Sequence, residues 1–485
     1  MGYSRYLWAT VQTLTNQVLP ELETSDKRDQ LINSLRVISR VAMSLDDGSE
    51  AARAAFENTL FPDDVRKAFA VMTIVSDPAE SISVDNYTQA GIREAARWLN
   101  ETAWCGDTAN TKIARELLQW EGSLRHQRDT RLAASEIAED KQNAGGPDDA
   151  LAIDGDKLQR YLREALKVPT LLVRDFRVLP GGRARTTALF ALEGHPDWPE
   201  WLVLQRDTPV AVHDFPGVSA QFPLIAYART AGMCLPRGFH LQPDRKYFGA
   251  PFMIVERMPG MPPSPGLHFF APAPKAESFA FSLAEQMGRL HSLSPAPMKD
   301  ILLNRSPENN DWASDLELWR KEWATSSHAP SMVVSAMLAW MQHHVGCVSH
   351  RQSLVHADMQ QHNLLMEDNK VSAILDWEGS HIGHPGEDIG YVRPLVEQIV
   401  SWDRFMEVYV ANGGASMTQE EVDYFTFRAY LWVMLMMMRA RDYFENGTVD
   451  DIRFAELGAF LVPAFVNCVG NVLDGVLARE ASTAC

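Results

Sequence analysis

Two aspartates and an asparagine form the most informative pattern in the sequence. Asp358 lies in a predicted loop, Asn363 follows five residues later, and Asp376 ends a predicted strand. Phosphoryl transfer uses this spacing, because an alcohol must be oriented toward a loosely bonded phosphoryl group while charge is neutralised. A carboxylate accepts the hydroxyl proton, whereas an amide oxygen and a second carboxylate suit Mg²⁺, which prefers oxygen ligands. The pattern therefore favours metal-assisted phosphoryl transfer.

Short apolar runs flank these polar residues and predict how they are positioned. Residues 364–366 (Leu-Leu-Met) and 373–375 (Ala-Ile-Leu) fit two short strands. Such strands would place Asn363 and Asp376 close together at one end of the strand pair. An isolated acidic residue before a strand is usually a turn former. The functional interpretation therefore depends on the combination with Asp358.

The preceding segment predicts a small sheet and the following segments predict helices. Residues 158–166 fit a short helix. Four apolar runs separated by turn signals fit strands, at 171–179, 187–192, 201–204 and 252–255. Because no regular crossover helices follow these runs, we expect an antiparallel sheet. Helical spacing returns after residue 258, at 279–290 and 331–345, and this predicts an α+β fold with a small sheet lobe and a larger helical lobe.

The first third of the chain has a different pattern of apolar residues. Residues 1–133 show helical spacing, as in Leu31, Leu35 and Ile38, and predict an all-helical N-terminal domain. Residues 134–154 are acidic, contain Gly-Gly-Pro and have almost no large apolar side chain. This composition predicts a flexible linker between the N-terminal domain and the two lobes.

Composition and charge exclude several classes of protein. The 485 residues include 45 basic and 63 acidic side chains, and the net charge of −18 opposes nucleic-acid binding. Five scattered cysteines without a CxxC pair argue against a disulfide framework and favour a reducing cytoplasm. The longest apolar run, residues 430–438, is far shorter than the ~20 residues needed to cross a bilayer. We expect it to be a core helix and expect no membrane partner.

At the acidic pattern the sequence resembles the aminoglycoside phosphotransferase and choline kinase-like family. The catalytic loop of this family reads His-Gly-Asp-x-x-x-x-Asn, and its metal site reads Asp-Trp-Glu, as at 376–378. Residues 252–260, 283–291 and 384–389 are also similar to family segments. The resemblance covers about residues 155–475. The most similar subgroup is the kinase domain fused to some acyl-CoA dehydrogenases.

The resemblance implies a bilobal protein kinase-like fold, with an N-lobe at 155–258 and a helical C-lobe at 259–485. ATP and Mg²⁺ are the implied cofactors. Position by position, Asp358 is the implied base that orients the acceptor hydroxyl, and Asn363 and Asp376 are the implied metal ligands. The implied supporting residues of the catalytic loop are His356 and Asp388.

One departure from the family lies inside the catalytic loop, where Ala357 replaces the usual glycine. Glycine is required at such a position only if the φ angle is positive. A kinase of the wider superfamily has arginine here. We therefore expect the loop to be compatible with activity.

Two further segments are expected to contact the nucleotide. The turn at 178–187, between two predicted strands, lies where a nucleotide-covering loop belongs, with Arg183 or Arg185 as added phosphate contacts. The residues after strand 252–255 resemble the hinge that pairs with adenine through backbone atoms. An ordinary hairpin turn and a plain strand end are the alternatives. The expected contacts are Gly181, Gly182, Arg183, Glu256 and Met258.

A second departure affects phosphate binding. Family members place a basic residue in the strand at 201–207 and a glutamate in the following helix, where this sequence has Gln205 and Gln221. Neighbouring strand residues face opposite sides, so Arg206 can substitute for the basic residue only through a register shift or bulge. Otherwise a neutral, weaker hydrogen bond from Gln205 replaces the charged phosphate contact.

These patterns leave two functional hypotheses. The first is a small-molecule kinase that transfers the γ-phosphate of ATP to a hydroxyl group, with a hydroxylated metabolite or hydroxyacyl thioester favoured over an aminoglycoside. Tyr391 and several tryptophans are candidates near its acceptor. The second is a pseudokinase that binds nucleotide weakly and acts as a scaffold, whose helical N-terminal domain binds a partner or forms a homodimer. Gln205 and Gln221 support the second hypothesis, and the intact acidic pattern supports the first.

Overall fold

The computed structural model describes residues 154–179, 185–207, 217–263, 273–307, 311–325, 331–445, 448 and 457–483. The predicted N-terminal domain (1–133), nearly all of the predicted linker and the turn residues Gly181, Gly182 and Arg183 lie outside these ranges. The chain divides into two compact units. One contains residues 142–310 and 349–426, and the other contains 1–141, 311–348 and 427–485. The predicted lobe at 259–485 is thus shared between the units, and the predicted domain boundaries stay predictions.

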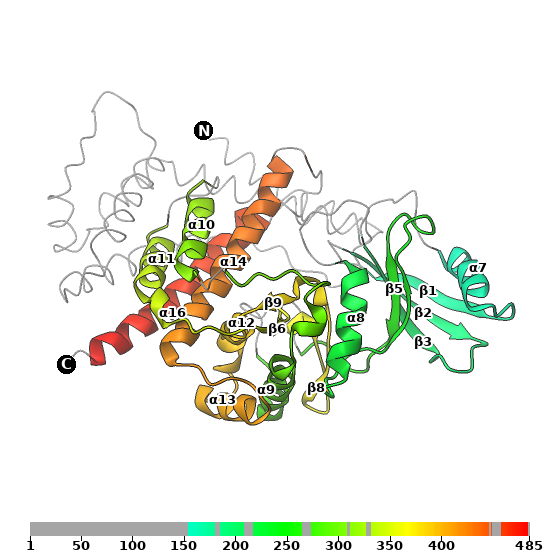
Figure 1. Ribbon diagram of the computed structural model, residues 1–485, viewed down its shortest axis with the longest axis horizontal. Coiled ribbons are helices and arrows are strands. Elements are labelled where there is room, and N and C mark those ends of the chain that lie inside the picture. The colour runs from blue at the N-terminus through cyan, green and yellow to red at the C-terminus, as the bar shows by residue number, and fades with distance from the viewer. Residues whose placement is uncertain are drawn as a thin grey trace, which may run out of the picture. The chain divides into compact units, whose positions relative to one another are not determined.

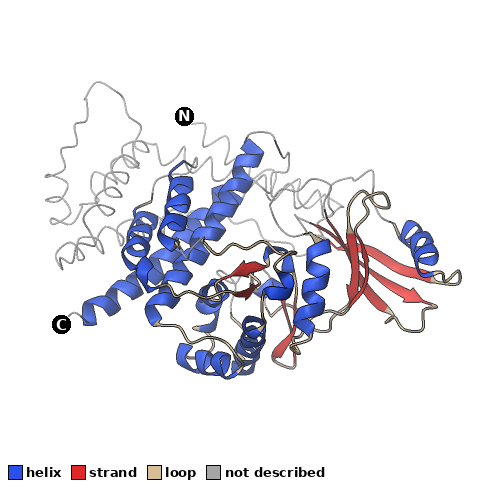
Figure 2. Cartoon of the chain, in the orientation of Figure 1, coloured by secondary structure: helices blue, strands red, loops and turns tan. Residues whose placement is uncertain are grey.

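The first unit is built on a five-stranded antiparallel sheet with the order β1-β2-β3-β5-β4 (Figures 1 and 2). The strands are β1 (Leu172–Leu179), β2 (Arg185–Glu193), β3 (Trp201–Asp207), β4 (Gly238–Gln242) and β5 (Phe252–Glu256). This confirms the predicted antiparallel sheet. Strand β4 was not predicted; it is short, and only Phe239 and Leu241 are large apolar residues in it.

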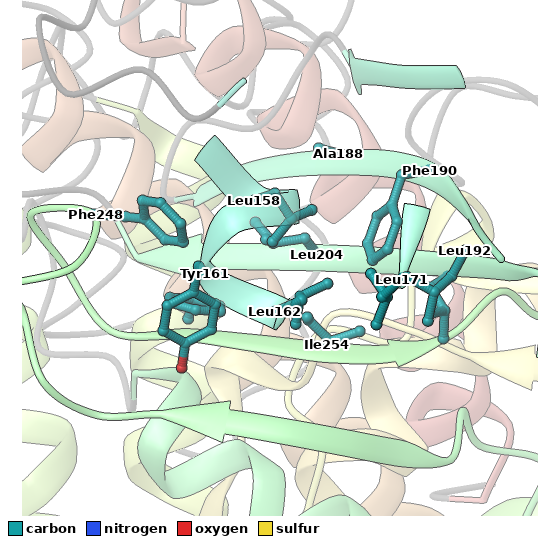
Figure 3. Close-up of a cluster of buried hydrophobic side chains, with 12 residues drawn as sticks. Leu158, Tyr161, Leu162, Leu171, Ala188, Phe190, Leu192, Leu204, Phe248 and Ile254 are labelled. Atoms are coloured by element: carbon teal, nitrogen blue, oxygen red, sulfur yellow. The ribbon is translucent and has the colours of Figure 1, made fainter. Parts of the chain in front are cut away.

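Helix α7 (Gly155–Leu166) covers one face of this sheet. It begins at Asp154, whose side chain accepts a hydrogen bond from the Lys157 amide, and it ends at Lys167 in a left-handed conformation. Its buried face packs on alternate residues of the strands, which form one apolar core (Figure 3). The labelled core includes Leu158, Tyr161, Leu162, Phe190, Leu204 and Ile254.

Helix α8 (Val218–Arg229) contacts β3, β4 and β5 from the opposite side of the sheet, as Figure 1 shows. Its only buried polar side chain is Gln221. Alternation along β3 places Leu202 and Leu204 in the core and turns Gln205 and Asp207 to the α8 side. The polar face of the sheet therefore lies under α8.

The chain leaves β5 through Met258 and Gly260 and then pairs with a second, two-stranded ladder. Gly260 has a φ of 98°, and a Cβ there would lie 2.7 Å from the Met366 carbonyl oxygen, so this close approach requires glycine. The ladder consists of β7 (Leu364–Glu367) and β8 (Lys370–Ile374). These strands confirm the two short strands that were predicted beside Asn363 and Asp376.

Helices and one further ladder complete the first unit. Strand β6 (Ser353–Val355) pairs with β9 (His381–Gly383). Helix α9 (Glu277–Ser292) packs against α13 (Trp402–Ala411) and against β6 and β8. Helix α12 (Gly386–Val396) follows β9 directly, so its first turn lies next to the strand that pairs with β6. The described residues of this unit confirm an α+β fold in which helices follow an antiparallel sheet.

The described part of the second unit is helical. Its helices are α10 (Trp312–Thr325), α11 (Met332–His344), α16 (Val462–Thr483) and the part of α14 (Gln419–Glu445) from Phe427 onward. Within this unit Arg428 forms an ion pair with Asp315 and lies over the Trp319 ring. The predicted core helix at 430–438 is confirmed, because most of its side chains are buried in α14. Among the described helices, none has the length and apolar content needed to cross a bilayer.

Candidate active site

The carboxylate of Asp358 is held by three side-chain donors. Its Oδ1 accepts hydrogen bonds from the Tyr391 hydroxyl at 2.7 Å and from Gln360 Nε2 at 3.1 Å. Its Oδ2 accepts a hydrogen bond from Asn363 Nδ2 at 2.8 Å. Burial, together with the negative charge of Asp358, raises the pKa of Tyr391, so this phenol stays a donor. The three donors fix the direction of the carboxylate.

Asn363 and Asp376 lie on adjoining segments of the same ladder. The Asn363 amide nitrogen points to both the carbonyl and the carboxylate of Asp358, so its Oδ1 is the atom left to bind a cation. The Leu375 amide donates to the Asn363 carbonyl at 2.7 Å, which fixes the end of β8 beside the loop. Asp376 follows with a φ of 59°, a left-handed conformation that aspartate adopts more readily than most residues.

Asp388, in the first turn of α12, holds the catalytic loop through its backbone. The fully buried carboxylate accepts hydrogen bonds from the amides of His356 at 2.8 Å and Ala357 at 2.7 Å. His291 Nε2 lies 3.0 Å from the same carboxylate. Burial alone raises the pKa of Asp388, but the hydrogen bond and charge of His291 and the loop amides bring it below its usual value.

The loop turns at Ala357 with a φ of 65°. The condition under which glycine is preferred is therefore met at this position. An alanine Cβ in this conformation costs roughly 1–2 kcal/mol relative to a right-handed residue. The two hydrogen bonds that the amides of His356 and Ala357 donate to the Asp388 carboxylate maintain the turn against this cost.

His356 connects the loop to the end of β8. Its Nε2 lies 2.9 Å from the Leu375 carbonyl, and its Nδ1 accepts from the Asp358 amide at 3.2 Å. Because a carbonyl only accepts and an amide only donates, the imidazole carries its proton on Nε2. The buried ring also packs edge-on against Trp377. His356 thus supports both the segment at Asp358 and the segment at Asp376.

A buried arginine of β2 faces a group of carboxylates. Arg185 Nη1 donates to Gln221 Oε1 at 2.6 Å and lies 3.8 Å from Asp376 Oδ1. Arg185 Nη2 lies 3.4 Å from Glu378 Oε2, and Nε lies 3.6 Å from Asp207 Oδ1. Burial, followed by the charge of Asp376, raises the pKa of Glu378 to about 8, although Arg185 acts in the opposite direction.

The two residues considered for phosphate binding in β3 lie on opposite faces. Strand β3 pairs with β2 without a register shift from Trp201 to Asp207. Arg206 is only 2% exposed and donates to the Phe248 carbonyl and the Thr186 hydroxyl. Gln205 faces the α8 side with Arg185. The shift that Arg206 would need is therefore absent from β3.

The predicted hinge residues follow β5. The Glu256 amide donates to the Arg237 carbonyl at 2.8 Å, and the Glu256 carboxylate accepts from the Arg237 amide at 3.1 Å. Met258 is half-buried between the end of β5 and Gly260. The structure thus places Glu256 and Met258 at the exit from the sheet, on the way to the β7–β8 ladder.

Three residues of the site have contacts that the sequence did not predict. Tyr391 was considered for the acceptor and Arg185 only as an added phosphate contact, and Gln360 was not considered. Tyr391 lies on α12, far along the chain from Asp358, and no local pattern connects the two. The position of Arg185 could have been predicted from strand register, because pairing of Thr187 with Gln205 puts Arg185 on the same face of the sheet as Gln205.

The chain is similar to known phosphotransferases and to acyl-CoA dehydrogenase family members. A family model described as "Phosphotransferase enzyme family" (APH) matches residues 156–421. Acyl-CoA dehydrogenase family member 10 of Mus musculus is 22% identical over 248 residues, which are 50% of this chain and 22% of that protein. Acyl-CoA dehydrogenase family member 11 of Rattus norvegicus is 24% identical over 170 residues, 34% of this chain and 21% of that protein.

The match spans only about a fifth of the length of these curated relatives (22% and 21%). They confirm the likeness to the kinase domain fused to some acyl-CoA dehydrogenases. Among solved structures, a putative aminoglycoside phosphotransferase from Ralstonia eutropha is 16% identical with a TM-score of 0.48, covering 66% of this chain and 98% of its own. Macrolide 2'-phosphotransferase MphH from Brachybacterium faecium is 17% identical with a TM-score of 0.44, covering 63% and 97%.

Proposed function

Since the chain belongs to the phosphotransferase enzyme family, we propose that it is a small-molecule kinase that moves the γ-phosphate of ATP to a hydroxyl group, with Mg²⁺ as cofactor. The observation that carries the proposal is the Asp358 carboxylate, which is fixed by three donors and is bonded directly to Asn363. A carboxylate held in this way is suited to orient an alcohol.

Asp358 acts in this proposal by orienting the acceptor hydroxyl. Hydrogen bonds from Tyr391, Gln360 and Asn363 hold its carboxylate in one orientation. The loose transition state of phosphoryl transfer needs an oriented nucleophile more than a strongly basic one. Asp358 therefore accepts the hydroxyl proton as the new oxygen–phosphorus bond forms.

The metal would be held by the Asn363 amide oxygen and the Asp376 carboxylate. In the described ranges no group of three or more His, Cys, Asp or Glu side chains is arranged to hold a metal ion. Magnesium often uses one or two protein carboxylates together with the phosphates of the substrate, and the proposed pair would supply one carboxylate and one amide oxygen. Arg185 is one cation beside the two carboxylates of Asp207 and Asp376, so these three groups carry one excess negative charge that a divalent cation would help to balance. When bound, Mg²⁺ neutralises the phosphate oxygens.

We assign the adenine contact to the backbone at Glu256 and Met258, where the chain leaves the sheet. Gly181, Gly182 and Arg183 stay proposals for the nucleotide-covering turn. The favoured acceptor is a hydroxylated metabolite or a hydroxyacyl thioester. The relatives named acyl-CoA dehydrogenase family members support a thioester-linked acceptor over an aminoglycoside. The scattered cysteines support a reducing compartment such as the cytoplasm.

A pseudokinase is the second candidate, because Gln205 and Gln221 lack the charges of the family pair. In that role the predicted N-terminal domain binds a partner or forms a homodimer. The network around Asp358 supports catalysis, because a scaffold has no need for a base with fixed orientation.

Product formation separates the two candidates. The purified chain is incubated with ATP and Mg²⁺ against hydroxyacyl thioesters, amino alcohols, simple alcohols and aminoglycosides, and phosphorylated products are detected by mass spectrometry. Asp358→Asn should lower kcat by about 10²-fold or more, since positioned bases contribute about 10²–10⁴-fold. Asp368→Asn, an exposed change in the β7–β8 turn, is the matched control and should leave kcat unchanged. A folded protein that binds nucleotide and phosphorylates no acceptor class identifies the pseudokinase instead.

A further inference from the structure

The geometry points to Arg185 as the residue that binds the nucleotide phosphates and positions Asp376, in place of the basic residue that family members have at position 205. This inference rests on the proposed function. Arg185 is the buried cation in β2 whose side chain is 7% exposed. It contacts three elements at once: β3 through Asp207, α8 through Gln221, and the end of β8 through Asp376.

Strand register explains how β2 can supply this charge. Thr187 pairs with Gln205, and Arg185 lies two residues away on the same face, opposite Asp207. The long arginine side chain therefore enters the space that a basic residue at 205 would occupy. Arg206 is on the other face and cannot do so.

The donors of Arg185 are only partly used by the described residues. A guanidinium has five N–H donors. Among its contacts with the described side chains, Gln221 lies at 2.6 Å, whereas the three carboxyl groups lie at 3.4, 3.6 and 3.8 Å. At these longer distances Arg185 forms ion pairs with the carboxyl groups but no close hydrogen bonds. A fixed, buried guanidinium with donors remaining beside Asp376 is suited to phosphate oxygens, which it can bind with two parallel bonds.

The partner on α8 preserves this charge. Gln221 is fully buried and accepts from Arg185 without neutralising it. A glutamate at 221 would add a fourth carboxylate around one cation and would hold the guanidinium away from the phosphates. The change to glutamine at 221 thus fits an arginine that arrives from β2, and the two glutamines need not indicate a loss of nucleotide binding.

The test removes the positive charge from β2 by mutation and then restores a positive charge in β3. Affinity for Mg·ADP is measured by calorimetry and turnover by mass spectrometry, with circular dichroism to check folding. Arg185→Gln should weaken Mg·ADP binding by about 10- to 100-fold, the range for hydrogen bonds to charged groups. Adding Gln205→Lys to that variant should recover at least part of the loss, because the charge returns to the same face. Arg177→Gln, an exposed change in β1, is the matched control and should bind as the unmodified chain does.

The possible outcomes distinguish a failure of this inference from a failure of the proposed function. If the unmodified chain turns over ATP and Arg185→Gln binds and reacts normally, the inference is wrong and the proposed function stands. Loss of binding that Gln205→Lys does not restore indicates a merely structural arginine and also overturns it. If Arg185→Gln fails to fold, Gln221→Glu replaces it, with about 10-fold weaker binding expected and unchanged affinity contradicting the inference.

Discussion

Replacing Asp388 by asparagine should loosen the catalytic loop while leaving the shape of the site nearly unchanged. The Asp388 carboxylate is fully buried and accepts from Ala357 N at 2.7 Å, His356 N at 2.8 Å and His291 Nε2 at 3.0 Å. Asparagine offers one acceptor oxygen and turns an NH₂ group toward the other donors. At least one loop amide therefore loses its partner in either orientation of the amide.

The structure gives the size of this effect. A hydrogen bond to a charged group contributes about 1.5–3 kcal/mol, and a buried donor without a partner costs about 1–3 kcal/mol. We therefore expect Asp388→Asn to lower the free energy of unfolding by about 3 kcal/mol. The left-handed Ala357 turn would relax, and a shift of about 1 Å in the position of Asp358 can lower kcat by about 10²-fold.

Urea denaturation at pH 7 measures the change in unfolding free energy, and product formation measures kcat. Asp403→Asn, an exposed change in the first turn of α13, is the matched control and should alter stability by less than about 0.5 kcal/mol. The pKa of Asp388 is lowered, so its contribution is present above its ordinary value of 3.8 and is lost as pH falls through the lowered pKa. The difference between the two proteins should accordingly shrink below pH 3.8.

A variant with unchanged stability and kcat at pH 7 would show that Asp388 does not hold the loop. A loss of stability with normal kcat would show that Asp388 stabilises the loop, but it would contradict the inference that this stabilisation positions Asp358.

Two further outcomes are expected. Ala357→Gly should raise the unfolding free energy by about 1 kcal/mol, because glycine accepts the φ of 65° without strain; equal or lower stability in urea contradicts this. Burial raises the pKa of Glu421, but hydrogen bonds from His384 and Ser349 lower it to about 2, so its stabilisation is present above its ordinary 4.5 and is lost as pH falls from 4.5 to 2. Thermal unfolding of Glu421→Gln should depend less on pH across that interval than the unmodified chain; parallel curves contradict the assignment.

The sequence by itself determined the local elements of the site. Apolar runs at 364–366 and 373–375 were sufficient to predict β7 and β8, because a short apolar run is a property of neighbouring residues. Strand signals of the same kind predicted the antiparallel sheet. Residue type and spacing also selected Asp358, Asn363 and Asp376, since the chemistry of oxygen ligands is carried by the side chains themselves.

Tertiary structure alone decided how these elements act on one another. The register of β2 on β3 turned Arg185 toward Asp376 and turned Arg206 into the opposite core, and a slip of one residue would exchange these two faces. Packing of α12 brought Tyr391 to Asp358, and the left-handed turn at Ala357 is held by the hydrogen bond that its amide donates to Asp388. Such contacts join residues distant in the chain, and their geometry depends on packing that no local pattern records.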